Sequence, residues 1–189
     1  MGIYQICVSG AAKGESAEEG KELARAAGAA IAKAGHSLLT GATTGLPEDA
    51  AAAYLKADGK SSLGISPAAT KVEHILKYRL PIKHYHNILY TGMHYIGRDV
   101  LMINSADAVI SVGGRLGTLH EFTIAIETQT PTGLLQGAGG VSDYFDELLR
   151  FKASGKEELV IFEDNAEVLV EKLTKLLDKL HKPYKNIYN

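Results

Sequence analysis

Short apolar runs alternate with amphipathic segments along the chain, and glycine or proline follows several of the runs. Residues 3–8 are apolar and partly β-branched, which is typical of a buried parallel strand. Further short apolar runs occupy 37–40, 62–66, 88–90, 108–112, 132–136 and 159–162. Segments with helical periodicity lie between them, and strands that alternate with helices predict a parallel sheet with right-handed crossovers.

The helices are expected at defined positions between these runs. Ser16 and Glu19 have the spacing of a capping box, so the first helix is expected to begin at Ser16 and to end at Gly35. Its apolar face comprises Leu23, Ala27, Ala30, Ile31 and Ala34. Later helices are expected after Pro47, around Arg98, and at about 118–128, 142–153 and 168–180. The less periodic segment 68–86 predicts a helix and an irregular connection.

Together these elements predict an α/β fold: a Rossmann-like doubly wound parallel sheet with helices on both faces, in three α/β/α layers. A chain of 189 residues, 46% hydrophobic and 22% charged, fits one domain with a full-sized core. Residues 1–181 are expected to form this nucleotide-binding domain, and residues 182–189 a loose C-terminal tail.

Charge and composition exclude several classes of partner. The net charge of −2 lacks the basic excess that binding to a phosphate backbone requires, so nucleic acid is not an expected partner. The amino terminus turns polar too soon for a signal peptide, and no run of about 18 apolar residues could span a membrane. Cys7 is the only cysteine, which excludes an intrachain disulfide and a cysteine-based metal site. A cytoplasmic protein is therefore expected.

Three glycine-bearing loops, 9–14, 41–45 and 113–118, follow predicted strands and are expected to meet at one edge of the sheet. Glycine lets backbone amides approach an anion closely, and a following helix offers unpaired N–H groups, which suits phosphate. An ordinary strand-to-helix turn is an equally good interpretation of any one loop. The candidate phosphate- or nucleotide-binding residues are Gly10, Gly41, Thr43, Gly45, Gly113, Gly114, Arg115, Gly117 and Thr118.

Other nucleotide motifs are missing. The first loop lacks the G-x-G-x-x-G spacing, and Leu39-Thr40-Gly41 ends the second predicted strand without a ribose-binding carboxylate, so an NAD dehydrogenase is not expected. The Walker sequence and a paired-acid magnesium site are absent too, and we expect neither a metal nor another cofactor. The histidines without metal-ligand spacing, to which we assign no role, are His84, His86, His94 and His120.

Arg98 and Glu121 are the candidate catalytic residues, and each has a structural alternative. Glu121 follows Thr118 by three residues, which is the spacing of a capping box. The functional interpretation places its carboxylate beside a phosphate loop, where the helix amino terminus favours the ionised form. Arg98 shares a helix face with Met102 and is either a surface arginine or a guanidinium that holds a phosphate or a substrate oxygen.

Arg98-x-x-x-Met102, followed by G-G-R-L-G-T-L-H-E at 113–121, resembles the LOG-like family, whose pattern is R-x-x-x-M and P-G-G-x-G-T-x-x-E. Residues 41–45 and G-I-S-P at 64–67 resemble its earlier glycine-rich turn and strand end. T-G-M at 91–93 and the V-G-G sequence are closer to its molybdenum-cofactor-carrier-like branch.

The resemblance implies a Rossmann-like homodimer that splits the N-glycosidic bond of an adenosine 5′-monophosphate, often N6-modified, into base and ribose 5-phosphate. It assigns Arg98 and Glu121 to the catalytic pair. It assigns Gly114, Gly117 and Thr118 to the phosphate cradle. The older family label, lysine decarboxylase, has no support because no lysine lies in a recognisable pyridoxal-phosphate setting.

Two departures separate the chain from the family pattern: Gly113 replaces the proline, and Arg115 replaces the second glycine. An arginine there either blocks close approach of the backbone to a phosphate or grips the phosphate itself.

The leading hypothesis is hydrolysis of a nucleoside 5′-monophosphate, supported by Arg98 and Glu121. The alternative is a non-catalytic binder or carrier of a nucleotide or molybdopterin-type cofactor, which Arg115 favours. A partner-regulated nucleotide sensor would need an interaction surface that the sequence does not reveal.

Overall fold

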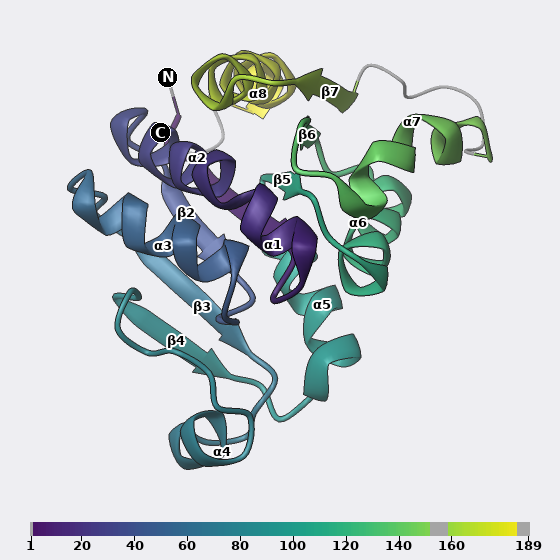
Figure 1. Ribbon diagram of the computed structural model, residues 1–189. Coiled ribbons are helices and arrows are strands. Elements are labelled where there is room, and N and C mark those ends of the chain that lie inside the picture. The colour runs from purple at the N-terminus through teal and green to yellow at the C-terminus, as the bar shows by residue number, and fades with distance from the viewer. Residues whose placement is uncertain (1, 152–158, 185–189) are drawn as a thin grey trace.

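Within residues 2–151 and 159–184, which the computed structural model describes, the strands form one parallel sheet in the order β4-β3-β2-β1-β5-β6-β7 (Figure 1). Each neighbouring pair of strands is parallel. The strands are β1 (Gln5–Gly10), β2 (Ser37–Thr40), β3 (Ser62–Ser66), β4 (Asn87–Tyr90), β5 (Ala108–Val112), β6 (Thr132–Leu135) and β7 (Val160–Glu163). The predicted doubly wound sheet is confirmed.

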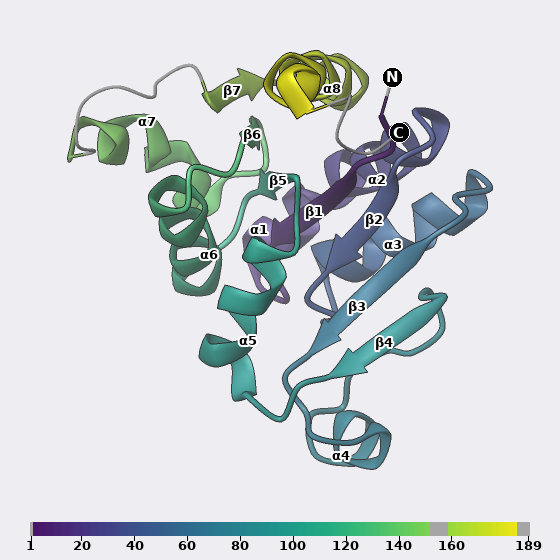
Figure 2. The same cartoon turned by 180° about the vertical axis from the view of Figure 1, so that it is seen from behind.

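Helices cover both faces of this sheet, which gives the expected three layers (Figures 1 and 2). One face packs against α1 (Glu15–Glu19), α2 (Lys21–Lys33), α3 (Leu46–Lys56) and α8 (Ala166–His181). The other packs against α5 (His94–Asn104) and α6 (Leu116–Glu127). The shorter elements are α4 (Lys71–Leu76), η1 (Gly140–Tyr144), α7 (Phe145–Leu148), η2 (Leu149–Phe151) and η4 (Lys182–Tyr184).

The central strand β1 shows why its sequence is continuously apolar. Ile6 and Val8 pack into the core beneath α2, α3 and α8, whereas Cys7 packs on the opposite side with Met102 and Ile103 of α5. All five side chains are buried. A strand covered on both faces has no exposed side on which polar residues would be favoured.

The helix that the sequence predicts from Ser16 onward begins at Glu15 and is interrupted at Gly20. Gly14, with φ of 94°, is the N-cap, and no side-chain hydrogen bond caps α1. The predicted capping box of Ser16 and Glu19 is therefore wrong, because the glycine lets the chain turn into the helix before Ser16 is reached. Gly20 then separates α1 from α2, and a Cβ there would lie 2.9 Å from side chains of Ala138 and Leu46.

Two segments in the carboxyl-terminal part of the chain differ from the prediction. The helix expected at 142–153 is a succession of η1, α7 and η2, and residues 152 and 153 lie outside the described residues. Part of the expected tail, 182–184, forms η4, while 185–189 lie outside the described residues. Among the helices that are described, none is long and apolar enough to cross a membrane.

Candidate functional site

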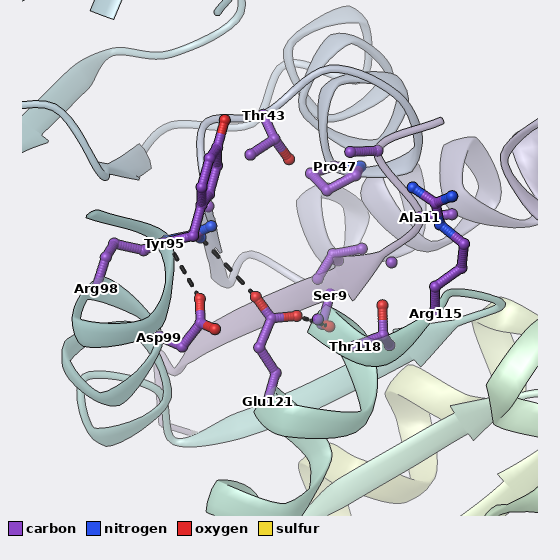
Figure 3. A pocket seen from close by; sticks show the side chains of 15 residues that line it. Ser9, Ala11, Thr43, Pro47, Tyr95, Arg98, Asp99, Arg115, Thr118 and Glu121 are labelled. Carbon is purple, nitrogen blue, oxygen red and sulfur yellow. Dashed lines mark hydrogen bonds and ion pairs between the residues drawn. The ribbon is translucent and has the colours of Figure 1, made fainter. Parts of the chain in front are cut away.

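A cavity lies beyond the carboxyl ends of β1 and β5, the two strands at which the winding of the sheet reverses direction. Ligands of doubly wound sheets bind at this switch point. The cavity has a volume of about 180 Å³. The predicted site residues that line it are Gly10, Gly41, Thr43, Arg98, Arg115, Gly117, Thr118 and Glu121 (Figure 3). The three glycine-bearing loops thus meet at one edge, as the sequence predicts.

Gly45, Gly113 and Gly114 are not among the residues that line the cavity. Their φ angles are 78°, 56° and 107°, which favour glycine over residues with a side chain. A Cβ on Gly45 would lie 2.4 Å from the carbonyl oxygen of Ala11, and one on Gly114 would lie 2.2 Å from Oγ1 of Thr118. The structure therefore gives these three glycines a role in the shape of the loops.

The start of α6 presents unpaired backbone donors to the cavity. Arg115 is the N-cap, and the bond from the amide of Leu119 to the carbonyl of Arg115 opens the helix ladder. The amides of Leu116, Gly117 and Thr118 consequently have no partner within α6. A Cβ on Gly117 would meet nothing within 4 Å, so the space on the side-chain side of this residue is open. Such a helix start, with its partial positive charge, suits a phosphate group.

Glu121 points into the cavity and does not cap α6. Thr118 lies inside the helix, so the capping-box alternative for Thr118 and Glu121 is wrong. The hydroxyl of Ser9, at the end of β1, donates a hydrogen bond to the Glu121 carboxylate (Figure 3). The other carboxylate oxygen lies 3.9 Å from Nη1 of Arg98. Strand β1 and helix α5 therefore fix the direction of this side chain between them.

Burial raises the pKa of Glu121 to about 7. The guanidinium of Arg98 opposes this shift, whereas the neighbouring Asp99 carboxylate adds to it. We expected the amino terminus of the helix to favour the ionised form. That expectation is wrong in direction, because the cost of removing the carboxylate from water exceeds the favourable charges around it. Glu121 can therefore gain and lose a proton near neutral pH.

Arg98 is a buried residue of α5, only 4% exposed, so the alternative of a surface arginine is wrong. Its Nη1 donates to the sulfur of Met102 at 3.3 Å, one helical turn along, as the shared face predicts. Its guanidinium carbon lies 6.0 Å from the centroid of the Tyr95 ring. These contacts hold the positive charge at the wall of the cavity, close to Glu121.

No sequence pattern singles out Asp99, and His120 has no role assigned from the sequence. Oδ1 of Asp99 lies 3.3 Å from Nε of Arg98, and Oδ2 lies 2.8 Å from Nδ1 of His120. Asp99 directly follows Arg98 in the sequence, and His120 directly precedes Glu121, so each lies beside a residue already singled out. Their contact depends on the packing of α5 against α6, which residue spacing alone does not reveal.

In the part of the chain that the structure describes, no cluster of three histidine, cysteine or acidic residues could hold a metal.

The fold and the cavity define a Rossmann-like protein with a cavity at the switch point of its sheet. The chain belongs to the SLOG cluster4 family, whose model matches residues 3–170. This confirms the resemblance to LOG-like proteins. It is also 35% identical over 127 residues to an uncharacterized protein of Archaeoglobus fulgidus, a match that covers 67% of this chain and 76% of the relative.

Two solved structures resemble the whole fold closely. The molybdenum cofactor binding protein of Rippkaea orientalis has a TM-score of 0.74 and 25% identity, with coverage of 94% of this chain and 99% of that one. The molybdenum cofactor carrier protein of Chlamydomonas reinhardtii has a TM-score of 0.75 and 23% identity, with coverage of 93% and 99%. The first of these likenesses agrees with the carrier-like branch of the family that the sequence indicates, and the second shows the shared fold.

Proposed function

We propose that the protein binds a nucleoside 5′-monophosphate in the cavity and hydrolyses its N-glycosidic bond, releasing the base and ribose 5-phosphate. The observation that carries this proposal is the buried pair of Arg98 and Glu121, whose Nη1 and Oε1 atoms lie 3.9 Å apart. Both residues line the same cavity as the start of α6. A buried carboxylate with a raised pKa beside a fixed guanidinium is typical of catalytic sites. Membership of the SLOG cluster4 family supports the same class of ligand.

The arrangement of the cavity gives the ligand a direction. Arg98 and Arg115 lie on opposite sides of the cavity, with Ser9 and Glu121 between them (Figure 3). A phosphate on the amides of Gly117 and Thr118 is next to Arg115, whose exposed side chain adds a second positive charge. The ribose then lies over Glu121. In this proposal Arg115 grips the phosphate instead of blocking the backbone.

The proposed reaction breaks the bond between C1′ of the ribose and the nitrogen of the base, whose electron pair leaves with the base. A positive charge develops on the ribose, and ionised Glu121 stabilises it. The oxygen of a water molecule bonds to C1′, Glu121 accepts the proton of that water, and the base takes up a proton from solvent. The hydrogen bond from Ser9 keeps one carboxylate oxygen fixed, and Arg98 holds the other side of the site.

The test is chromatographic detection of free base and ribose 5-phosphate from AMP and N6-substituted AMP. We expect release by the native protein and a loss of at least about 100-fold in Glu121→Gln, since the amide cannot accept a proton. Glu127→Gln, which changes an exposed carboxylate on the same helix, serves as the matched control and should retain activity. Tight AMP binding without release by the native protein would contradict the proposal.

A non-catalytic carrier of a molybdopterin-type cofactor is the second candidate function. Arg115 in the phosphate loop favours this candidate. It is also supported by the likeness to a molybdenum cofactor binding protein and a molybdenum cofactor carrier protein. The same amides at the start of α6 would hold the phosphate of such a ligand. A carrier should bind its cargo tightly and leave AMP intact, so the product assay separates the two candidates.

We also propose the homodimer that the LOG-like resemblance implies. The support is a group of partly or largely exposed apolar side chains that follow the outer surface of α5, namely Met93, Ile96, Val100 and Leu101. Apolar patches of this kind on a protein surface mark interaction sites. Equilibrium sedimentation at micromolar concentration should give twice the mass of the chain, and a monomer would contradict the dimer.

A further inference from the structure

Tyr95 stands at the edge of the cavity with much of its ring uncovered. It lies in the first turn of α5, lines the cavity and is 45% exposed. Its ring stands over the side where Arg98 enters, and its hydroxyl points toward the region of Thr43 (Figure 3). The remaining side chains that line the cavity are aliphatic, small or charged. Tyr95 therefore contributes the aromatic surface of this site.

Neighbouring side chains hold this ring in place: the Arg98 guanidinium lies over it, 6.0 Å from its centroid, and the residue stays 45% exposed. The ring of Tyr78 packs edge-on against it, with centroids 5.6 Å apart and planes at 79°. The Tyr78 hydroxyl is itself 2.7 Å from Nδ1 of His94, the residue before Tyr95. His94 has a positive φ of 55°, which is uncommon for a residue other than glycine and marks a backbone shaped by its surroundings. The tyrosine is thus oriented before any ligand arrives.

The size of the cavity determines which part of a nucleotide it can enclose. Its volume of about 180 Å³ is below the roughly 300–1,000 Å³ of pockets that enclose a drug-sized ligand. Ribose and phosphate can occupy the space between Glu121 and the start of α6. The base must then lie toward the opening. With the phosphate on the Arg115 side, the base extends toward the side of Tyr95.

We propose that Tyr95 is the surface on which the planar ring system of the ligand stacks, with the ribose and phosphate held deeper in the cavity. This inference rests on the proposed nucleotide site. Stacking on an aromatic face requires a flat π system and reads few details of its edge. The expected ligand is therefore a phosphorylated compound with a flat, unsaturated ring system, and substituents on the edge of that ring are tolerated because they do not project from its face.

The test is calorimetric titration with two probes that the protein cannot turn over. The first is the carbocyclic analogue of AMP, in which a methylene group replaces the ring oxygen of the ribose. The second is ribose 5-phosphate, which has no base. We expect Tyr95→Ala to weaken binding of the analogue about tenfold or more and to leave ribose 5-phosphate within about twofold. Tyr95→Phe, which keeps the ring, should retain analogue binding within about threefold. Tyr144→Ala removes an exposed tyrosine of η1, outside the residues that line the cavity, and should change neither affinity.

Several outcomes would overturn this inference. If Tyr95→Ala left the affinity of the analogue unchanged, the base would lie elsewhere. If it weakened both probes equally, the tyrosine would only shape the cavity around Arg98. Neither result touches the hydrolase proposal, which depends on product release from AMP. Conversely, base-dependent binding through Tyr95 without release would support the stacking surface and remove the hydrolase. If the native protein bound neither probe, the stacking inference would fail, whereas the hydrolase proposal would still be decided by product release from AMP.

Discussion

The guanidinium of Arg98 packs directly against Gly41, in the loop after β2, where a Cβ would lie 1.8 Å from Nη1. The same Cβ would lie 2.7 Å from the central guanidinium carbon. The missing side chain of Gly41 therefore makes room for the buried arginine. Through this contact the loop after β2 fixes the position of a side chain that α5 supplies to the cavity.

Gly41→Ala is expected to displace Arg98. The arginine is buried, so its guanidinium has little room in which to move aside. We expect a loss of unfolding free energy of about 1–3 kcal/mol, which is typical of an overpacked site. We also expect product release from AMP to fall at least about tenfold. Urea denaturation and the product assay measure the two effects. A variant with native stability and activity would show that the contact is unimportant.

Gly117→Ala is expected to separate ligand binding from stability. A Cβ there meets nothing within 4 Å of the protein, and the residue is helical, so the free energy of unfolding should change by less than about 1 kcal/mol. The added methyl group occupies the space proposed for the phosphate, so ribose 5-phosphate should bind at least about tenfold more weakly. Unchanged affinity in calorimetry would place the phosphate elsewhere.

Gly114→Ala, in contrast, is expected to lower the stability of the protein. The φ of 107° is strained for alanine, and a Cβ would lie 2.2 Å from Oγ1 of Thr118. Together these effects should cost about 1–3 kcal/mol of unfolding free energy. Thermal denaturation of Gly114→Ala and Gly117→Ala under the same conditions compares the two glycines. Equal melting temperatures for the two variants would contradict the structural role assigned to Gly114.

Glu121 is expected to make the stability of the protein depend on pH. Its pKa rises from 4.5 to about 7 on folding. Its stabilising contribution is therefore complete below pH 4.5 and is lost as the pH rises through about 7. Relative to Glu121→Gln, the native protein should lose on the order of 1–3 kcal/mol between pH 5 and pH 8. Urea denaturation at both values measures the difference, with Glu127→Gln as control. A difference that stayed constant with pH would exclude a raised pKa.

The pH dependence of product release should report the same group. If ionised Glu121 accepts the proton of water, kcat/KM should rise with pH and level off above about 7. Asp99 raises the pKa of Glu121 through its charge and a hydrogen bond. Asp99→Asn should therefore move the midpoint of the profile to lower pH. A midpoint that stayed in place or rose would contradict this coupling between the two carboxyl groups.

The sequence predicted the sheet and the edge at which the three glycine-bearing loops meet, because both follow from local patterns. Continuous apolar runs such as β1 indicate strands buried on both faces, and parallel strands bring their carboxyl ends to one edge. The sequence could single out Arg98 and Glu121 as candidates because each belongs to a motif of adjacent residues. The loops carried the glycines, but spacing could not separate Gly117, which faces open space, from Gly114, which is needed for the backbone.

The rest of the site depends on contacts between distant segments. The hydrogen bond from Ser9 to Glu121 joins residues 112 positions apart, and Asp99 meets His120 across two helices. The raised pKa of Glu121 has the same origin, since burial is a property of the packed fold. The helix start at Gly14 was missed for a different reason: Ser16 and Glu19 have the right spacing, but the turn that precedes them begins earlier.

The most direct measurement is a crystal structure of the protein with the carbocyclic analogue of AMP. We expect the phosphate within hydrogen-bond distance of the amides of Gly117 and Thr118, C1′ beside the Glu121 carboxylate, and the base against Tyr95. An analogue bound outside this cavity would contradict the proposed site. A reversed orientation, with the base at the start of α6, would contradict the proposed chemistry.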